Sequence, residues 1–193
     1  MLSLQESLKI LKETRALIEG HFILSSGLHS PKYVQCAQLM SKPDMADKLC
    51  LSLAEKIKKD FIDFDLILSP AMGGVIIGYE IGKLLKKETI FSERVNGKFQ
   101  LRRGFEIKKD SKVLIIEDVI TTGKSSLECS KLVKINKGVI IGYACIINRS
   151  NGKSEIKAKI VSQIELNIPT FSEDNIPKEL SSIEPVKPGS RSL

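Results

Sequence analysis

VLIIEDVITTGKSS, residues 113–126, is the stretch that decides the fold. Its first four residues form a continuous apolar run, which is typical of a strand covered by helices on both faces. Two carboxylates follow, Glu117 and Asp118, and then a loop of small residues that opens a helix. In an open parallel sheet, ligands bind at the carboxyl ends of the strands. The segment therefore predicts a buried central strand with a ligand site at its end.

Apolar runs and helical patterns alternate on both sides of this segment. We expect strands at 66–68, 89–91, 113–116 and 139–147, helices at 74–85 and 124–135, and a polar loop at 92–104. This order predicts an α/β fold with a central, mainly parallel sheet, flanked by helices and joined by right-handed crossovers. A length of 193 residues fits one domain with enough buried surface to fold without disulfide or metal staples.

The two ends of the chain differ from this central pattern. Ser3 and Glu6 form a capping box, and the leucines after them predict a helix that continues to about Gly20. Residues 21–36 alternate turn residues with short extended pieces such as 33–36, and 43–59 predicts another helix. Residues 167–193 contain four of the seven prolines, so we expect an irregular cap with a loose tail over 185–193.

Composition limits the function classes. The chain has 30 Lys and Arg against 23 Asp and Glu, a net charge of +7, which favours an anionic partner, either nucleic acid or a phosphorylated small molecule. Aromatic residues make up 5% and Trp is absent, which argues against a stacking platform for single-stranded nucleic acid. The four cysteines form no C-x-x-C pair, so we expect reduced thiols and no zinc site. The sequence shows neither a signal peptide nor a long apolar run, so a cytoplasmic protein is expected.

The loop 121–125 is suited to bind a phosphate. Its threonines and serine offer hydroxyls, and the start of the following helix offers backbone N–H groups at the positive end of the helix dipole. Glu117 and Asp118 would repel a bare phosphate, but they suit a ligand that also carries hydroxyls, such as a ribose. Gly123-Lys124-Ser125 matches the end of the P-loop motif G-x-x-x-x-G-K-[ST]. The first glycine of that motif would have to be residue 118, which is Asp, so a nucleoside triphosphatase is excluded. A plain strand-to-helix turn with a capping Thr is the remaining alternative.

The segment EDVITTGKS resembles the phosphoribosyl-pyrophosphate signature of the type I phosphoribosyltransferases. Within that family, GHFILSSGLHSPKYVQC (20–36) and PAMGGVIIG (70–78) are similar to the amino-terminal and pyrophosphate-loop segments of orotate phosphoribosyltransferases. FSERVNGKFQLRRG (91–104) resembles their mobile catalytic loop in the short bacterial form. The resemblance covers about residues 5–150. It implies a type I phosphoribosyltransferase fold as a single domain, with a small hood contributed mainly by about residues 1–40.

The resemblance also implies the reaction and its partners. Ribose 5-phosphate would pass from phosphoribosyl pyrophosphate to orotate, giving orotidine 5′-monophosphate and pyrophosphate in pyrimidine (UMP) biosynthesis. Mg²⁺ would be held mainly through substrate, with no protein ligand assigned. The enzyme would be a homodimer whose 92–104 loop acts across the interface, and neither nucleic acid nor a membrane would be a partner.

The resemblance assigns roles residue by residue. Lys98 and Asp118 would be catalytic, while Thr121 and Arg149 would bind orotate. The pyrophosphate loop would comprise Ala71, Met72, Gly73 and Gly74. The residues that would bind phosphoribosyl pyrophosphate are Arg94, Lys98, Glu117, Asp118, Val119, Ile120, Thr121, Thr122, Gly123, Lys124 and Ser125.

Some positions depart from the longer bacterial enzymes. Ser25 and Gly73 stand where those enzymes have lysines, and Gln100 stands where they have a histidine, which leaves open how pyrophosphate charge is neutralised outside the loop. His21 and His29 are interpreted as local structural residues rather than acid–base groups. Two other functions stay open: a phosphoribosyltransferase for another base, such as a purine, and a non-catalytic regulator of this fold that binds nucleic acid.

Overall fold

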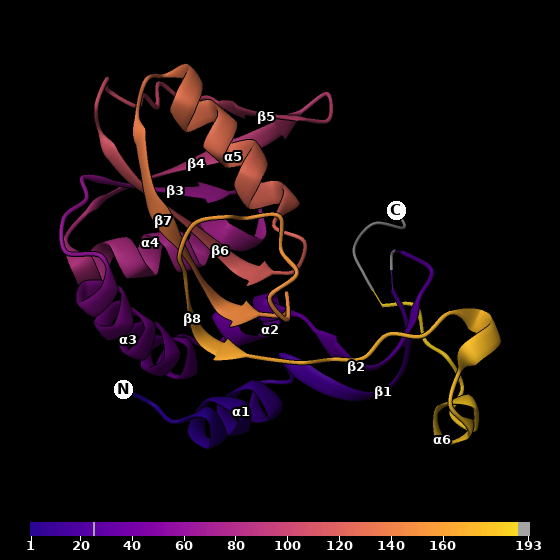
Figure 1. Ribbon diagram of the computed structural model, residues 1–193. Coiled ribbons are helices and arrows are strands. Elements are labelled where there is room, and N and C mark those ends of the chain that lie inside the picture. The colour runs from indigo at the N-terminus through magenta and orange to yellow at the C-terminus, as the bar shows by residue number, and fades with distance from the viewer. Residues whose placement is uncertain (25, 189–193) are drawn as a thin grey trace.

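The main body of the protein is a six-stranded sheet with helices on both faces (Figure 1). This computed structural model describes residues 1–24 and 26–188, so Ser25 and the last part of the expected tail lie outside the described residues. The strand order is β5-β4-β3-β6-β7-β8; β4 and β5 are antiparallel, and the other neighbours are parallel. The strands are β3 (Leu66–Pro70), β4 (Glu88–Val95), β5 (Lys98–Leu101), β6 (Lys112–Ile120), β7 (Val139–Asn148) and β8 (Ile160–Glu165). The expected α/β architecture is confirmed.

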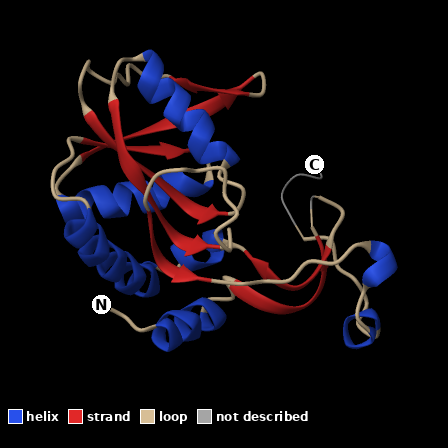
Figure 2. Cartoon of the chain, viewed as in Figure 1, coloured by secondary structure: helices blue, strands red, loops and turns tan. Residues whose placement is uncertain are grey.

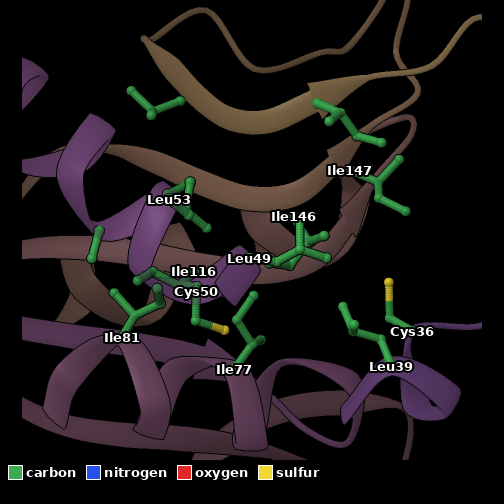
Figure 3. Close-up of a cluster of buried hydrophobic side chains, with 14 of the residues drawn as sticks. Cys36, Leu39, Leu49, Cys50, Leu53, Ile77, Ile81, Ile116, Ile146 and Ile147 are labelled. Carbon is green, nitrogen blue, oxygen red and sulfur yellow. The ribbon is translucent and has the colours of Figure 1, made fainter. Parts of the chain in front are cut away.

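Each face of the sheet has its own apolar core. One face is covered by α3 (Pro43–Asp60) and α4 (Gly73–Leu85), with α1 (Leu4–Glu13) and the short α2 (Cys36–Met40) beside them. Figure 3 shows this core, in which Leu49 of α3 and Ile77 of α4 approach Ile116 of the sheet. The opposite face is covered by α5 (Lys124–Ile135), which packs through Cys129 and Val133. Among the described residues, no helix combines the length and the apolar character needed to span a membrane.

β6 lies in the centre of the sheet, between β3 and β7. Residues 113–116 are fully buried, because helices cover both faces. The pairing of β6 with β3 ends at Ile115, whereas its pairing with β7 continues to Ile120. The last part of β6 therefore extends past the paired part of β3 and borders the loop that follows it.

A second sheet of two strands forms the hood. β1 (Leu17–Ile23) and β2 (His29–Val34) are antiparallel, and they extend away from the main sheet (Figures 1 and 2). The end of the chain returns to this sheet: Phe171 pairs with His29, and Val186 pairs with Phe22. The short helices η1 (Glu173–Asn175) and α6 (Lys178–Ser181) lie in the returning segment. The hood thus includes residues 171–186 in addition to the N-terminal residues.

Two element boundaries expected from the sequence are wrong, and one strand was not expected at all. The first helix ends at Glu13 rather than near Gly20, because Arg15 takes a φ of 60° and the residues after it pair as β1. The extended piece expected through Cys36 stops at Val34, and Cys36 begins α2. β8 lies in a stretch for which the sequence analysis predicts no element, yet it pairs along β7.

Most of the segment 92–104, which the sequence predicts as a polar loop, is a hairpin that ends at Leu101. β4 continues to Val95, and the turn Asn96–Gly97 leads directly into β5. Both turn residues have positive φ, 48° and 78°, which is what a two-residue hairpin turn requires. The Asn-Gly pair is therefore the signal in the sequence that could have predicted this hairpin.

His21 and His29 form a buried pair that joins the hood to the end of the chain. His21 Nε2 lies 2.6 Å from His29 Nδ1, and His21 Nδ1 lies 2.9 Å from the carbonyl oxygen of Ile183. A carbonyl can only accept, so Nδ1 of His21 carries a proton, and in the neutral pair His29 donates to His21. Both histidines thus have a structural role, in agreement with their interpretation from the sequence.

Replacing His21 by alanine should lower the free energy of unfolding by about 2 kcal/mol, because a buried donor is lost and His29 is left without its partner. Urea unfolding measures this change. Exchange of the Val186 amide, which bonds the His21 carbonyl oxygen, should also accelerate. Asn175→Ala is the control, since that exposed side chain bonds Ser172 within the same segment. Equal stability of His21→Ala and the parent would show that the pair does not hold the segment.

Candidate active site

Three loops meet at the carboxyl edge of the main sheet. They follow β3, β6 and β7 and lead into α4, α5 and β8, respectively. Two backbone hydrogen bonds tie the second loop to the third: the Arg149 amide donates to the Ile120 carbonyl at 2.8 Å, and the Glu155 amide donates to the Thr122 carbonyl at 3.0 Å. This edge is where open α/β sheets bind ligands, as the sequence predicts.

The loop 121–125 presents a helix start with little capping: the Lys124 amide donates to Thr122 Oγ1 in a long hydrogen bond of 3.4 Å. Gly123 is the N-cap of α5, and no side chain bonds the first turn from that position. Its φ of 81° favours glycine, and a Cβ there would also lie 2.7 Å from the Ile156 side chain. Thr121, Thr122 and Lys124 are exposed. Backbone N–H groups, hydroxyls and the helix dipole therefore combine into a cradle for a phosphate.

Glu117 and Asp118 are partly buried carboxylates directly before this cradle. Burial raises the pKa of Glu117 to about 7, against a hydrogen bond donated by the Ser126 hydroxyl. Burial also raises the pKa of Asp118, against hydrogen bonds from backbone amides. Both groups thus lack full compensation for their charge. Hydroxyl donors of a ligand would supply it, whereas a bare phosphate would not.

The loop after β3 lies against Asp118. At Gly73 a Cβ would come within 2.5 Å of Asp118 Oδ2, so any side chain there would displace the carboxylate. The peptide bond between Ala71 and Met72 is cis, and α4 begins at Gly73 without a side-chain cap. This close approach places Gly73 directly beside Asp118, on the loop 71–74 that the sequence predicts to bind pyrophosphate. It also explains why a lysine at position 73 would not fit this arrangement of Asp118.

Arg149 follows the last residue of β7 and has an open donor. Its Nε is buried and has no hydrogen-bond partner among the described residues. Burial lowers the pKa of Arg149, and Tyr33 of β2 acts in the opposite direction. An arginine keeps its charge in a protein, so a buried donor without a partner is an open position for an anionic acceptor. Because Tyr33 belongs to the hood, this position lies between the hood and the main sheet.

Within one chain, Lys98 and Arg94 do not lie next to Glu117 and Asp118. They lie on the edge hairpin, which β3 separates from β6. The Arg94 guanidinium bonds Glu128 of α5 and the Gly97 carbonyl, each at 2.6 Å, and it stacks 4.1 Å from the Phe99 ring centroid. Lys98 is exposed at the start of β5, and Figure 1 shows the turn of this hairpin projecting beyond the body of the sheet.

Two of the expected ligand-binding residues contribute little side-chain surface, and one residue was missed. The Ile120 side chain is buried in the core beneath α5, and that of Val119 packs against the core on the opposite face of the sheet, so these positions face a ligand through their backbone. The sequence analysis missed Ser126, whose fully buried hydroxyl bonds Glu117. A serine in the first turn of a helix carries no signal that it reaches a carboxylate on the preceding strand.

Comparisons with known proteins agree with this arrangement. The family of the phosphoribosyl transferase domain matches residues 35–179. Orotate phosphoribosyltransferase of Methylorubrum populi is 46% identical over 190 residues, which is 98% of this chain and 97% of that protein. The enzyme of Carboxydothermus hydrogenoformans is 43% identical over 95% of this chain and 96% of its own length. The crystal structure of orotate phosphoribosyltransferase from Aeropyrum pernix shares the fold, with a TM-score of 0.72, 23% identity, and coverage of 82% of this chain and 92% of that chain. With the phosphate cradle, the paired acids and the open arginine at one sheet edge, these similarities establish that the chain belongs to the orotate phosphoribosyltransferase family.

Proposed function

We propose that the protein transfers ribose 5-phosphate from phosphoribosyl pyrophosphate to a ring nitrogen of orotate, forming orotidine 5′-monophosphate and pyrophosphate in pyrimidine biosynthesis. The observation that carries the choice of base is Arg149, whose buried Nε has no partner among the described residues. A guanidinium suits the carboxylate of orotate, which it can bind through two parallel hydrogen bonds. A neutral purine offers no such group.

The residues at the sheet edge divide the substrate between them. Residues 121–125 hold the 5-phosphate, Glu117 and Asp118 accept from the ribose hydroxyls, and backbone N–H groups of 71–74 bind pyrophosphate. The transition state resembles an oxocarbenium ion, with negative charge growing on the departing pyrophosphate. Catalysis is then mainly positioning, together with the cations Lys98 and Arg94 at the leaving group.

The donor set at the site fits a substrate that carries Mg²⁺. Two carboxylates border a cradle for anions, an arrangement that is favourable when the bound pyrophosphate brings a divalent cation with it. Bound Mg²⁺ would supply positive charge to the leaving group. We assign it to substrate oxygens and water, with no protein ligand.

The direct test is an absorbance assay of orotate loss with phosphoribosyl pyrophosphate and Mg²⁺, run beside adenine, hypoxanthine and uracil. Turnover of orotate alone is the expected result. Turnover of a purine instead would assign the enzyme to another base. Absence of turnover together with salt-sensitive binding of nucleic acid would favour the regulator.

Arg149→Ala should reduce kcat/KM for orotate by roughly 30- to 1,000-fold, the loss of about 2–4 kcal/mol expected when one partner of a buried charged contact is removed. Binding of phosphoribosyl pyrophosphate, measured by calorimetry, should change little. Lys153→Ala is the matched control, because Lys153 is an exposed cation on the same loop. If both substrates bind more weakly to the same extent, Arg149 is not a base-specific contact.

We propose further that the protein is a homodimer. An apolar stripe at the start of α4 supports this: Met72, the residue just before the helix, and Ile76 and Tyr79 within it are 84%, 56% and 66% exposed and follow one another at helical spacing. Beside it lies a groove of about 280 Å³, lined by Ile76, Tyr79 and Phe91 among others. A second copy would cover this surface and receive the exposed hairpin that carries Lys98.

We place the enzyme in the cytoplasm. All four cysteines are free and buried, which suits a reducing compartment.

A further inference from the structure

The hydroxyl of Ser126 holds one oxygen of Glu117. Ser126 lies in the first turn of α5, its side chain is fully buried, and its Oγ donates to Glu117 Oε2. Glu117 is at the end of β6, so the hydrogen bond joins helix to strand next to the phosphate cradle. The Ser125 hydroxyl also favours the charged form of Glu117, and Oε1 is the oxygen that the Ser126 hydrogen bond leaves open to a ligand.

A second set of hydrogen bonds fixes the backbone of Ser126. The Ser130 hydroxyl donates to the Ser126 carbonyl at 2.9 Å and lies 2.5 Å from the hydroxyl of Tyr143 on β7. Because the proton of Ser130 is used by the carbonyl, Tyr143 is the donor in that contact. The first turns of α5 are thereby tied to the sheet independently of Glu117.

We infer that Ser126 is a positioning residue for the proposed reaction: it fixes the Glu117 carboxylate so that Oε1 faces a ribose hydroxyl of phosphoribosyl pyrophosphate. Without this donor, a partly buried carboxylate either rotates toward water or binds a proton, and both changes remove the acceptor. The inference rests on the proposed function, since it assigns a role within the same site.

Few other groups around Glu117 titrate in the working range. Asp118 lies next to it on β6, and the thiols of Cys129 on α5 and Cys145 on β7 also face it. Burial raises the pKa of Cys129 to about 12 and that of Cys145 well above its usual range, so both thiols are neutral at ordinary pH. Glu117 and Asp118, whose pKa values are both raised by burial, are therefore the groups to consider in any titration here.

The test compares Ser126→Ala with Ser130→Ala. Both variants lose one buried hydroxyl from the same helix, but only Ser126 contacts Glu117. Ser126→Ala should raise KM for phosphoribosyl pyrophosphate by roughly 10-fold, with a smaller change in kcat, whereas Ser130→Ala should leave both within about twofold. Ser126→Thr, which keeps a hydroxyl, should recover most of the loss. Equal effects of the two alanine variants would assign Ser126 to helix packing and overturn the inference.

The ionisation of Glu117 gives a readout that a packing role would not change. The ¹³C NMR signal of the Glu117 carboxyl is assigned as the one that disappears in Glu117→Gln. In the parent protein, the chemical shift of this signal should titrate with a midpoint near pH 7. Loss of a donor that favours the charged form should raise this midpoint by roughly one pH unit in Ser126→Ala and leave it unchanged in Ser130→Ala. An unchanged midpoint in Ser126→Ala would contradict the inference.

A failure of the proposed function would be recognised separately. Calorimetric binding of phosphoribosyl pyrophosphate with Mg²⁺ requires neither orotate nor turnover. If the parent does not consume orotate, the proposed function fails. The ratio of the dissociation constants of Ser126→Ala and Ser130→Ala for phosphoribosyl pyrophosphate still tests the role of Ser126. In a Glu117→Gln background, Ser126→Ala should cause no further loss; a further loss of the same size would also contradict the inference.

Discussion

Asp118→Asn should leave the protein folded and reduce its turnover by roughly 100- to 1,000-fold, the loss typical of removing one electrostatic contact to a transition state. Asparagine has nearly the shape of aspartate, so it fits against Gly73, where no room for a larger group exists. It lacks the negative charge that, in the proposed complex, accepts from the sugar hydroxyls. Steady-state rates with saturating orotate measure the effect.

The stability of Asp118→Asn separates a functional loss from a structural one. Burial raises the pKa of Asp118 in the folded protein, so its ionisation costs stability as pH rises from the usual range of a carboxyl group through the raised value. Asparagine has no charge to bury, so at neutral pH the variant should unfold at the same or a higher urea concentration. Asp110→Asn is the matched control, since Asp110 is exposed and has a φ of 64°, which asparagine tolerates. A fully active Asp118→Asn enzyme would remove Asp118 from the site.

Lys98→Ala should also be nearly inactive, with a loss of roughly 100-fold or more, because the reaction proposed above would lose the ammonium at its departing pyrophosphate. Lys98 is exposed at the start of β5, so the free energy of unfolding should change by less than about 0.5 kcal/mol. Lys109→Ala, an exposed lysine outside the hairpin, is the control and should keep parental activity.

Mixing Lys98→Ala with Asp118→Asn tests whether the hairpin serves the other subunit. If it does, a mixed dimer has one site with both lesions and one site with neither, and mixing should restore roughly a quarter of parental activity, since about half of the dimers are mixed. If the hairpin serves its own subunit, each site keeps one lesion. No recovery, with exchange confirmed by native mass spectrometry, would rule out the shared site and leave the enzyme assignment intact.

The elements that the sequence predicts well are those governed by local pattern. The apolar run at 113–116 and the helix at 124–135 are confirmed, because a buried central strand and a helix with one apolar face have patterns that tertiary context does not override. The sequence predicts too long a first helix because Ile18 keeps the helical spacing of Leu4, Leu8 and Leu11, whereas residues 17–23 form β1 and pair with β2. The β4–β5 hairpin was missed because a polar segment was interpreted as a loop despite its Asn-Gly turn.

In the candidate site, too, the sequence predicts what is local and does not predict contacts between elements. The phosphate cradle is contiguous in sequence, so its hydroxyls and helix start are visible in the residues alone. The approach of Gly73 to Asp118 and the bond from Ser126 to Glu117 join different elements, and only the packing of strand, loop and helix creates them. The separation of Lys98 from the acids depends on strand order, which no local pattern specifies.

Residues 171–186 complete the hood, so the hood can form only after most of the chain has been translated. His21 and Ile183 are 162 positions apart, so β1 and β2 leave the ribosome long before their last partners are translated. Joining the ends of so long a loop is entropically costly in an unfolded chain, but the main sheet lies between them and can fold first. A nascent chain therefore carries its phosphate cradle before the hood around Tyr33 is complete. The hood around Tyr33 is therefore completed late in synthesis, after residues 171–186 have been translated and have paired with β1 and β2.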